Sequence, residues 1–426
     1  MVGLPIATVL SSRADLSRAR IGFCSPSMTQ IAKRKVRLML VAGEPSGDAH
    51  AAHLVNELRE VAPDAQFEFF GSTGAQMRAQ GVDPIVIADD LAILGLVEIG
   101  RALPKFWSAF RQLKHAAIER RPDAVILVDW PDFNLRLARS LHRRGLKIIY
   151  YISPQLWAWR EYRVRTIRRD VDLLLSILPF EKDWFAARGV SQVKYVGHPL
   201  AGEVQARYDR AEFSRRNGLD SSRPIVALLP GSRHKEVVRI LPPMLGAASV
   251  IAKQRDDIQF VVVIAPNRDP EEARQIIAAG NYDSDLGNSL CIVHHETREA
   301  LSAADAAAVA SGTATLEAAL LGTPLVIVYK ESRINWHTLG RLITAEHYGL
   351  ANLIAGRRLV TELIQDDLNV ERLAKELLLL IEPERNRSMR ADLHEVSEKL
   401  GEGGASRRAA QEILSFIQSS KSPRGS

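Results

Sequence analysis

Residues able to do chemistry gather in turns that follow apolar, strand-like runs. Asp129 comes directly after the apolar run 124–128 and begins the turn 129–134. A carboxylate at the end of a buried strand can serve as a general base, an effect worth about 10²- to 10⁴-fold in rate. We favour Asp129 over Asp132 because it lies closer to the strand. Aspartate before a proline-containing turn is also common in structural turns, so the residues alone leave both interpretations open.

A glycine-containing turn at residues 43–48 leads from the first apolar run into a helix-compatible stretch. Glycine lets a ligand approach the backbone, and the start of a helix offers free N–H groups to an anion or a sugar hydroxyl. The turn has neither the lysine of a Walker A loop nor the spacing of G-x-G-x-x-G or G-x-S-x-G. It is either a binding turn or a plain turn in which Ser46 caps the helix.

Two turns in the second half of the chain have the same strand-to-helix setting. A Gly-Ser-Arg turn at a helix start offers backbone donors and a guanidinium, which together suit a diphosphate. A capped turn with a surface arginine is the alternative. The other turn opens a helix of small residues, where a carboxylate one turn in could hold a ribose diol. The residues are Gly231, Ser232 and Arg233 in one turn and Ser311, Gly312, Thr313 and Glu317 in the other.

Short apolar runs must position these turns. Their continuous Val, Ile and Leu character predicts strands buried on both faces, as in parallel sheets covered by helices. Ligands bind beyond the carboxyl ends of such strands. We therefore expect the α/β class, with two Rossmann-like parallel-sheet domains facing across a cleft. The expected strands are 36–41, 67–70, 124–128, 147–152, 173–177, 193–196, 225–229, 260–264, 290–293, 306–309 and 325–328.

The same patterns predict the domain organisation. A polar, charge-rich stretch separates the two series of strands, and helical periodicity follows the second series. The expected parts are a disordered basic leader at 1–35, an N-terminal domain at 36–200, a linker at 201–224, a C-terminal domain at 225–370, C-terminal helices at 371–418 and a disordered tail at 419–426.

Charge and cysteine content exclude several classes of function. The leader carries six basic side chains against one acidic side chain, a local +5 within the total of +6. The remaining chain is nearly neutral, so a broad nucleic-acid surface is not expected. The leader's composition also suits an import peptide. Cys24 and Cys291 lie too far apart for a redox pair or a zinc site, and no run approaches the roughly 20 apolar residues of a membrane-spanning helix.

Residues 91–113 are unusually apolar for a connection between strands. Large apolar side chains recur there at helical spacing beside basic ones, which suits a helix lying on a membrane surface. Core packing is the commoner reason for such a stripe. A basic helix after Trp157 offers a similar choice between a solvated face and a contact with anionic lipid or lipid phosphate. Its arginines are Arg160, Arg163, Arg165, Arg168 and Arg169.

Taken together, these segments resemble the lipid-A-disaccharide synthase family, which is inverting and has a glycosyltransferase-B type fold. The resemblance covers about residues 36–415, with the family's strings in the family's order. The strings are AGEPSGD (42–48), GLVEIG (95–100), DWPDFN (129–134), YYISPQLWAWR (150–160), LPFEKDWF (178–185), VGHPL (196–200), LLPGSRHKEV (228–237), ASGTATLEAAL (310–320) and NLIAGRRLVTELIQ (352–365).

The resemblance implies a reaction and roles for the turns. A 2,3-diacylglucosamine unit would pass from its UDP derivative to 2,3-diacylglucosamine 1-phosphate (lipid X), giving the β-1,6-linked lipid A disaccharide phosphate and UDP. Asp129 stands where the family's proposed base sits, to deprotonate the acceptor's 6-hydroxyl. Arg233 and its turn would stabilise the departing diphosphate, and Glu317 with residues 311–313 would hold the nucleoside. Residues matching the family's substrate cleft are Glu44, Ser46, Gly47 and Asn352.

The resemblance also implies partners and a location. No Asp-x-Asp sequence lies near the diphosphate turn, so neither a metal ion nor another cofactor is expected. Family members are cytoplasmic, peripheral on the inner face of the cytoplasmic membrane, and homodimeric. Contacts with acyl chains or membrane would come from Leu96, Val97, Leu103, Phe106, Trp107 and Phe110. Two alternatives remain: another UDP-sugar transferase or epimerase of the same fold, and a non-enzymatic membrane-binding protein.

Overall fold

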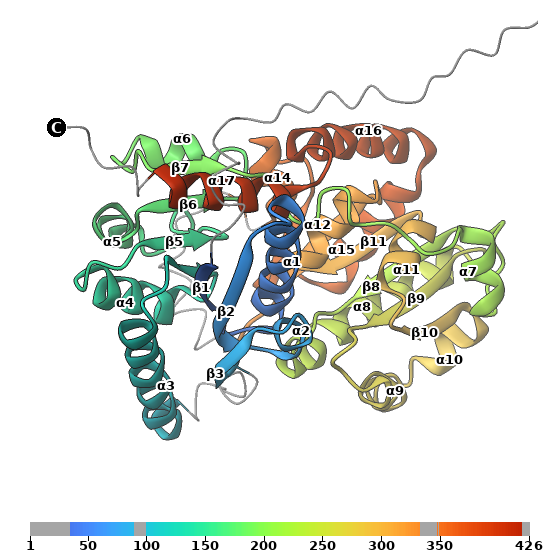
Figure 1. Cartoon of the computed structure of the whole chain (residues 1–426). Coiled ribbons are helices and arrows are strands. Elements are labelled where there is room, and N and C mark those ends of the chain that lie inside the picture. Colours follow the sequence, from blue (N-terminus) through green and yellow to red (C-terminus); the bar gives the residue numbers. More distant parts are fainter. Residues whose placement is uncertain (1–34, 89–98, 333–346, 348, 420–426) are drawn as a thin grey trace, which may run out of the picture.

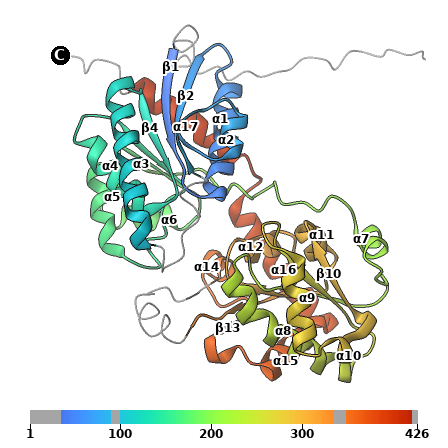
Figure 2. The same ribbon diagram turned by 90° about the horizontal axis from the view of Figure 1, so that it is seen from below.

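Two α/β domains lie side by side in the computed structural model, which describes residues 35–88, 99–332, 347 and 349–419 (Figure 1). Each domain contains one sheet in which every neighbouring pair of strands is parallel. Figure 2 shows the helices covering both sheets. The expected α/β architecture with two parallel sheets is confirmed.

The N-terminal sheet has the strand order β3-β2-β1-β4-β5-β6-β7. The order reverses between β1 and β4, so the loops that follow these two strands diverge and leave room for a ligand. The turns that begin at Gly43 and Asp129 both follow this switch point. The strands are β1 Lys35–Val41, β2 Gln66–Thr73, β3 Asp83–Ile87, β4 Ala124–Val128, β5 Ile148–Tyr151, β6 Leu173–Ser176 and β7 Val193–Tyr195.

The C-terminal sheet has the order β10-β9-β8-β11-β12-β13. Its switch point lies between β8 and β11, and the turns at Gly231 and Ser311 follow these strands. The strands are β8 Ile225–Leu229, β9 Gln259–Ile264, β10 Leu290–His294, β11 Ala306–Ala310, β12 Leu325–Tyr329 and β13 Glu362–Ile364.

Helices connect the strands and cover both faces of each sheet, as right-handed parallel connections require. The helices of the N-terminal domain are α1 Pro45–Val61, α2 Ala75–Ala79, α3 Ile99–Arg120, α4 Pro131–His142, the 3₁₀-helix η3 Glu161–Arg163, α5 Val164–Asp170 and α6 Glu181–Ala186. Those that follow are α7 Arg210–Arg216, α8 His234–Gln254, α9 Pro270–Ala279, α10 Asp283–Leu286, η4 Gly287–Ser289, α11 Thr297–Ala303, α12 Thr313–Leu320, α14 Leu350–Ala355, η6 Gln365–Asp367, α15 Val370–Ile381, α16 Pro383–Leu400 and α17 Ala405–Ser419.

The final helix, α17, returns to the N-terminal domain (Figures 1 and 2). Its apolar face joins the core between α1 and the N-terminal sheet, where Ile413 and Leu54 are fully buried. Arg408 fixes the entry of this helix, because its Nε donates to the Val196 carbonyl at 2.7 Å and its Nη1 to the Gly403 carbonyl at 2.6 Å. The last helix therefore completes the first domain.

The strands expected from the sequence are present, and the structure adds two short ones. β3 and β13 lie at sheet edges and carry polar or proline residues, which weaken the strand signal. Helix α7 lies within the stretch expected as a linker, where Phe213 is fully buried.

Candidate active site

The turn after β4 holds Asp129 in an unusual backbone conformation. Asp129 and Trp130 have φ values of 48° and 50°, a left-handed geometry that costs a non-glycine residue about 1–3 kcal/mol. Two side chains hold the turn in place: the hydroxyl of Tyr150 donates to the Asp129 carbonyl at 2.6 Å and the amide of Asn134 donates to it at 2.7 Å. Such strain is typical of functional turns.

The electrostatic surroundings of Asp129 suit a general base. Burial, and after it the negative charge of Glu44, raise the pKa of its carboxyl to about 6, against a hydrogen bond from the Trp130 backbone N–H that lowers it. Glu44 comes from the turn after β1, so the sheet has brought together carboxylates that are distant in the chain. A carboxyl that titrates near neutral pH can both accept and release a proton.

The turn after β1 begins α1 earlier than the sequence suggested. Pro45 is the first helical residue and Glu44 is the N-cap residue, without a side-chain cap. Ser46 lies in the first turn, exposed, so the alternative in which Ser46 caps the helix is wrong. A Cβ at Gly43 would lie 2.1 Å from the Trp130 ring. Glycine is needed there because the turns after β1 and β4 pack against each other.

Asp48, at the end of the same turn, has a structural role that the sequence did not indicate. Its buried carboxylate accepts hydrogen bonds from the backbone N–H groups of Gly74 at 2.7 Å, Gln76 at 2.8 Å and Met77 at 3.2 Å. It thereby satisfies the free donors at the start of α2.

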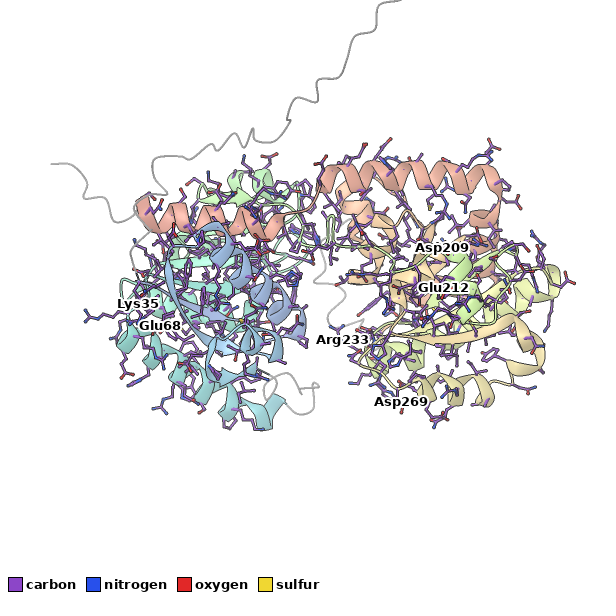
Figure 3. The ribbon with its side chains drawn as sticks, turned by 45° about the vertical axis from the view of Figure 1, so that its right-hand side comes forward. Lys35, Glu68, Asp209, Glu212, Arg233 and Asp269 are labelled. Atoms are coloured by element: carbon purple, nitrogen blue, oxygen red, sulfur yellow. The ribbon has the colours of Figure 1, made fainter. Side chains whose placement is uncertain are left out.

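A cavity of about 300 Å³ lies at the switch point of the C-terminal sheet. Every residue expected to hold the UDP moiety lines it: Gly231, Ser232, Arg233, Ser311, Gly312, Thr313 and Glu317. The sequence reasoning missed further lining residues, among them Glu236 and Thr297. Figure 3 shows Arg233 on the side of this domain that faces the N-terminal domain.

Glu236 organises the Gly-Ser-Arg turn. One of its carboxylate oxygens accepts from the backbone N–H groups of Ser232 at 3.0 Å and Arg233 at 3.2 Å, and the other accepts from Arg233 Nη1 at 2.8 Å. A Cβ at Gly231 would lie 2.5 Å from the same carboxylate, which explains the glycine. The Arg233 side chain is 80% exposed even with this contact, so Glu236 is the group that orients it.

Glu317 lies where this cavity meets a second one of about 340 Å³. Its carboxylate pairs with Arg298 at 3.1 Å, and Arg298 also donates to the Glu203 carbonyl at 3.0 Å. Arg298 thus links the C-terminal cavity to the segment that joins the two domains.

Comparison with known proteins identifies the family. The sequence model described as lipid-A-disaccharide synthetase matches residues 38–416. The chain belongs to the lipid-A-disaccharide synthase family. It is 44% identical to the lipid-A-disaccharide synthase of Solibacter usitatus over 384 residues, which is 89% of this chain and 97% of that protein. The synthase of Myxococcus xanthus is 43% identical over 382 residues, again 89% and 97%. The chain is therefore a glycosyltransferase.

Solved structures share the fold with this synthase-family enzyme at low identity. A putative UDP-N-acetylglucosamine 2-epimerase from Listeria monocytogenes superposes with a TM-score of 0.61 at 16% identity, over 90% of this chain and 97% of that one. The S. aureus MnaA-UDP co-structure gives 0.61 at 12% identity, over the same shares. These are glycosyltransferase-B type folds, as the sequence predicted. The close synthase relatives do not favour the epimerase and non-enzymatic alternatives.

Asn352 of the enzyme is buried and fully hydrogen bonded. Its Nδ2 donates to the Val360 carbonyl at 2.9 Å and to Glu362 at 2.8 Å, while its Oδ1 accepts from the N–H groups of Leu359 and Val360. These contacts close the turn between α14 and β13. A direct contact between Asn352 and substrate stays a prediction.

The apolar stretch of the enzyme joins the Asp129 turn. In α3, Phe106 lies 5.9 Å from Trp130 between ring centroids, and Phe110 makes an edge contact with Phe133 at 6.0 Å. Trp107 stacks on Phe110 but is 61% exposed. The stripe is therefore part core and part surface. Leu96 and Val97 lie outside the described residues, as does the side chain of Leu103.

Two histidines that the sequence reasoning passed over lie near each other in the N-terminal domain. Burial, and after it the charge of a neighbouring histidine, lower the pKa of His50 and of His198 to about 4. Both are therefore neutral at pH 7.

None of the helices described here is long and apolar enough to cross a membrane. The described residues also contain no group of three His, Cys, Asp or Glu side chains suited to a metal ion.

Proposed function

We propose that the enzyme transfers 2,3-diacylglucosamine from UDP-2,3-diacylglucosamine to 2,3-diacylglucosamine 1-phosphate, forming the β-1,6-linked lipid A disaccharide 1-phosphate and UDP. The observation that carries this proposal is the match to curated lipid-A-disaccharide synthases over about nine-tenths of the chain. The site supports it with a candidate base in one domain and a nucleotide-sized cavity in the other.

Asp129 is the proposed general base. Its carboxylate accepts the proton of the acceptor's 6-hydroxyl while that oxygen attacks the anomeric carbon of the donor. The bond between the anomeric carbon and the diphosphate oxygen breaks, and its electron pair leaves with UDP, so one displacement inverts the configuration. A pKa of about 6 leaves Asp129 ionised at pH 7 and more basic than an ordinary carboxylate.

The C-terminal cavity is the proposed UDP site. Negative charge develops on the departing diphosphate, and Arg233 with the N–H groups at the start of α8 would stabilise it. Glu317 would accept hydrogen bonds from the ribose hydroxyls, beside Ser311, Gly312 and Thr313. In the opposite domain, Glu44, Ser46 and Gly47 line the turn that would meet the sugars.

The acyl chains of both substrates need an apolar surface near the base. The half-buried Phe106 and Phe110 and the exposed Trp107 supply one beside the Asp129 turn. We propose that α3 contacts the inner face of the cytoplasmic membrane peripherally. The homodimer stays a prediction, since it follows from the family resemblance alone.

The test is a thin-layer assay of purified protein with both lipid substrates in mixed micelles, comparing wild type with Asp129→Ala. Disaccharide from wild type and its loss in a folded variant that still binds UDP would support the reaction and the base. Wild type that binds UDP but makes no disaccharide would refute the acceptor assignment. Full activity in Asp129→Ala would refute the base.

A further inference from the structure

Two arginines converge on the turn that carries the candidate base. Strands β4 and β5 are parallel neighbours, so the loops after them leave the same edge of the sheet. The loop after β5 brings Arg160 and Arg163 to Asp132, whose Oδ1 accepts from Arg160 Nη1 at 2.8 Å and also from Arg163 Nη2. Burial raises the pKa of Asp132, but the two arginines outweigh it and lower the pKa overall.

This cluster holds more positive charge than its carboxylate offsets. Two guanidiniums share one carboxylate oxygen, and each has five N–H donors, so both keep donors for another ligand. Neighbouring charges are paired elsewhere: Glu161 binds Arg188 at 2.7 Å. Arg160 is further fixed by stacking on Trp159, with its guanidinium carbon 4.0 Å from the ring centroid.

The cluster lies close to the candidate base. Asp132 is the second residue of α4, and Asp129 lies in the left-handed turn just before this helix. Tyr150 connects the two: its hydroxyl donates to the Asp129 carbonyl at 2.6 Å, and beside the dominant effect of burial the pKa of Tyr150 is raised by the charges of Asp129 and Asp132 and lowered by that of Arg163. In the acceptor, C1 and the carbon that bears the 6-hydroxymethyl group are both bonded to the ring oxygen, so the 1-phosphate and the 6-hydroxyl lie within one sugar ring of each other. A sugar whose 6-hydroxyl reaches Asp129 can therefore present its phosphate to the arginines.

We propose that Arg160 and Arg163 bind the 1-phosphate of the acceptor sugar, which rests on the function proposed above. A phosphate monoester carries a charge of about −1.5 to −2 at pH 7, and guanidiniums bind it through paired hydrogen bonds. Asp132 acts as a positioning residue: it holds both guanidiniums before the acceptor arrives. The arginines thus select a phosphorylated acceptor and orient its 6-hydroxyl toward the base.

The test is steady-state kinetics in neutral-detergent micelles with Arg160→Gln and Arg163→Gln. Two acceptors are compared, the 1-phosphate and the same diacylated sugar with a free 1-hydroxyl. Loss of a charged hydrogen bond should raise the KM for the phosphorylated acceptor about 10- to 100-fold. The KM for the UDP-sugar and the turnover of the dephosphorylated acceptor should stay unchanged.

Arg188→Gln is the matched control, because Arg188 is 34% exposed, close to the 32% of Arg160, and also pairs with a single carboxylate. It should leave both acceptors unaffected. Arg163 is only 14% exposed, so Arg160→Gln decides the matter if the other variant unfolds.

Three results would overturn the proposal. Equal losses with both acceptors would mean that the arginines only shape the loop. An equal rise in the KM for the phosphorylated acceptor in Arg188→Gln would mean that the effect comes from the positive charge of the surface in general and not from a specific contact with the phosphate. A loss seen only with vesicles containing anionic phospholipid, and absent in neutral micelles, would assign the arginines to the membrane headgroup instead. Wild type forms the disaccharide in each of these cases, so these results refute the phosphate site without refuting the proposed function.

Discussion

Replacing Asp129 with asparagine should make the protein more stable while it removes most of its activity. The ionised carboxylate is held in a site that raises its pKa from 3.8 to about 6. Each pKa unit corresponds to 1.36 kcal/mol, so the charge costs the folded state up to about 3 kcal/mol at pH 7.5. An uncharged asparagine of similar shape avoids this cost.

The sign of the pH dependence follows from proton linkage. Because the folded pKa is raised, the native state binds more protons than the unfolded state between about pH 4 and 6, and wild type loses stability as pH rises through this window. Asp129→Asn should therefore raise the free energy of unfolding by about 3 kcal/mol at pH 7.5 and by about 1.6 kcal/mol at pH 5.0. Activity should fall about 10²- to 10⁴-fold.

Urea unfolding at the two pH values measures the effect, with Asp132→Asn as the control. Asp132 is paired with two arginines and its pKa is lowered. Its replacement should therefore lower the free energy of unfolding, by less than about 1 kcal/mol, as for exposed ion pairs. A variant at Asp129 that is no more stable than wild type at pH 7.5 would refute the reasoning, and so would a gain independent of pH.

Three further substitutions test the surroundings of the site. Glu44→Gln removes a charge that raises the pKa of Asp129, so the acid limb of kcat/KM should move to lower pH in a profile from pH 5 to 8. Glu236→Gln frees the Arg233 guanidinium and should raise the KM for UDP-sugar about 10-fold. In an Arg233→Ala background it should have no further effect on KM. Trp107→Asp should leave the thermal midpoint unchanged, because Trp107 is 61% exposed, but reduce flotation with lipid vesicles.

Much of the fold could be predicted because its strands are buried on both faces. β4 and β8 read as continuous apolar runs that end at a polar turn. Parallel geometry then places the ends of neighbouring strands along one edge of the sheet, and this alone brings the four candidate turns to the two switch points. The C-terminal cavity was partly predictable for the same reason, since the turns that follow β8 and β11 contribute much of its lining.

The roles of individual polar residues could not be read in this way. Asp48, Glu181 and Asn352 all lie in strings that resemble the family, yet each is buried and saturated by hydrogen bonds within the protein. Glu181, for example, accepts from Ser153 at 2.7 Å and from Trp157 at 3.2 Å. The sequence shows the same residue type whether a carboxylate or amide organises a loop or binds substrate. Only the three-dimensional contacts distinguish the two roles.

The return of α17 to the first domain was equally hidden, because an amphipathic helix does not indicate which surface its apolar face covers. Ile413→Ala tests this packing. Ile413 is fully buried among residues of the N-terminal domain, so the variant should lose about 2–5 kcal/mol. Hydrogen exchange should then rise in α1 and β1, at the opposite end of the chain.

Leu393→Ala is the matched control, since Leu393 is equally buried but packs in the C-terminal domain. Its exchange should rise around α15 and β11 and leave α1 protected. If Ile413→Ala loosened only the C-terminal helices, α17 would not complete the first domain. If both expectations hold, the helix connects the domain that carries the candidate base to the domain that carries the proposed UDP cavity, so damage to α17 affects the candidate site through packing alone.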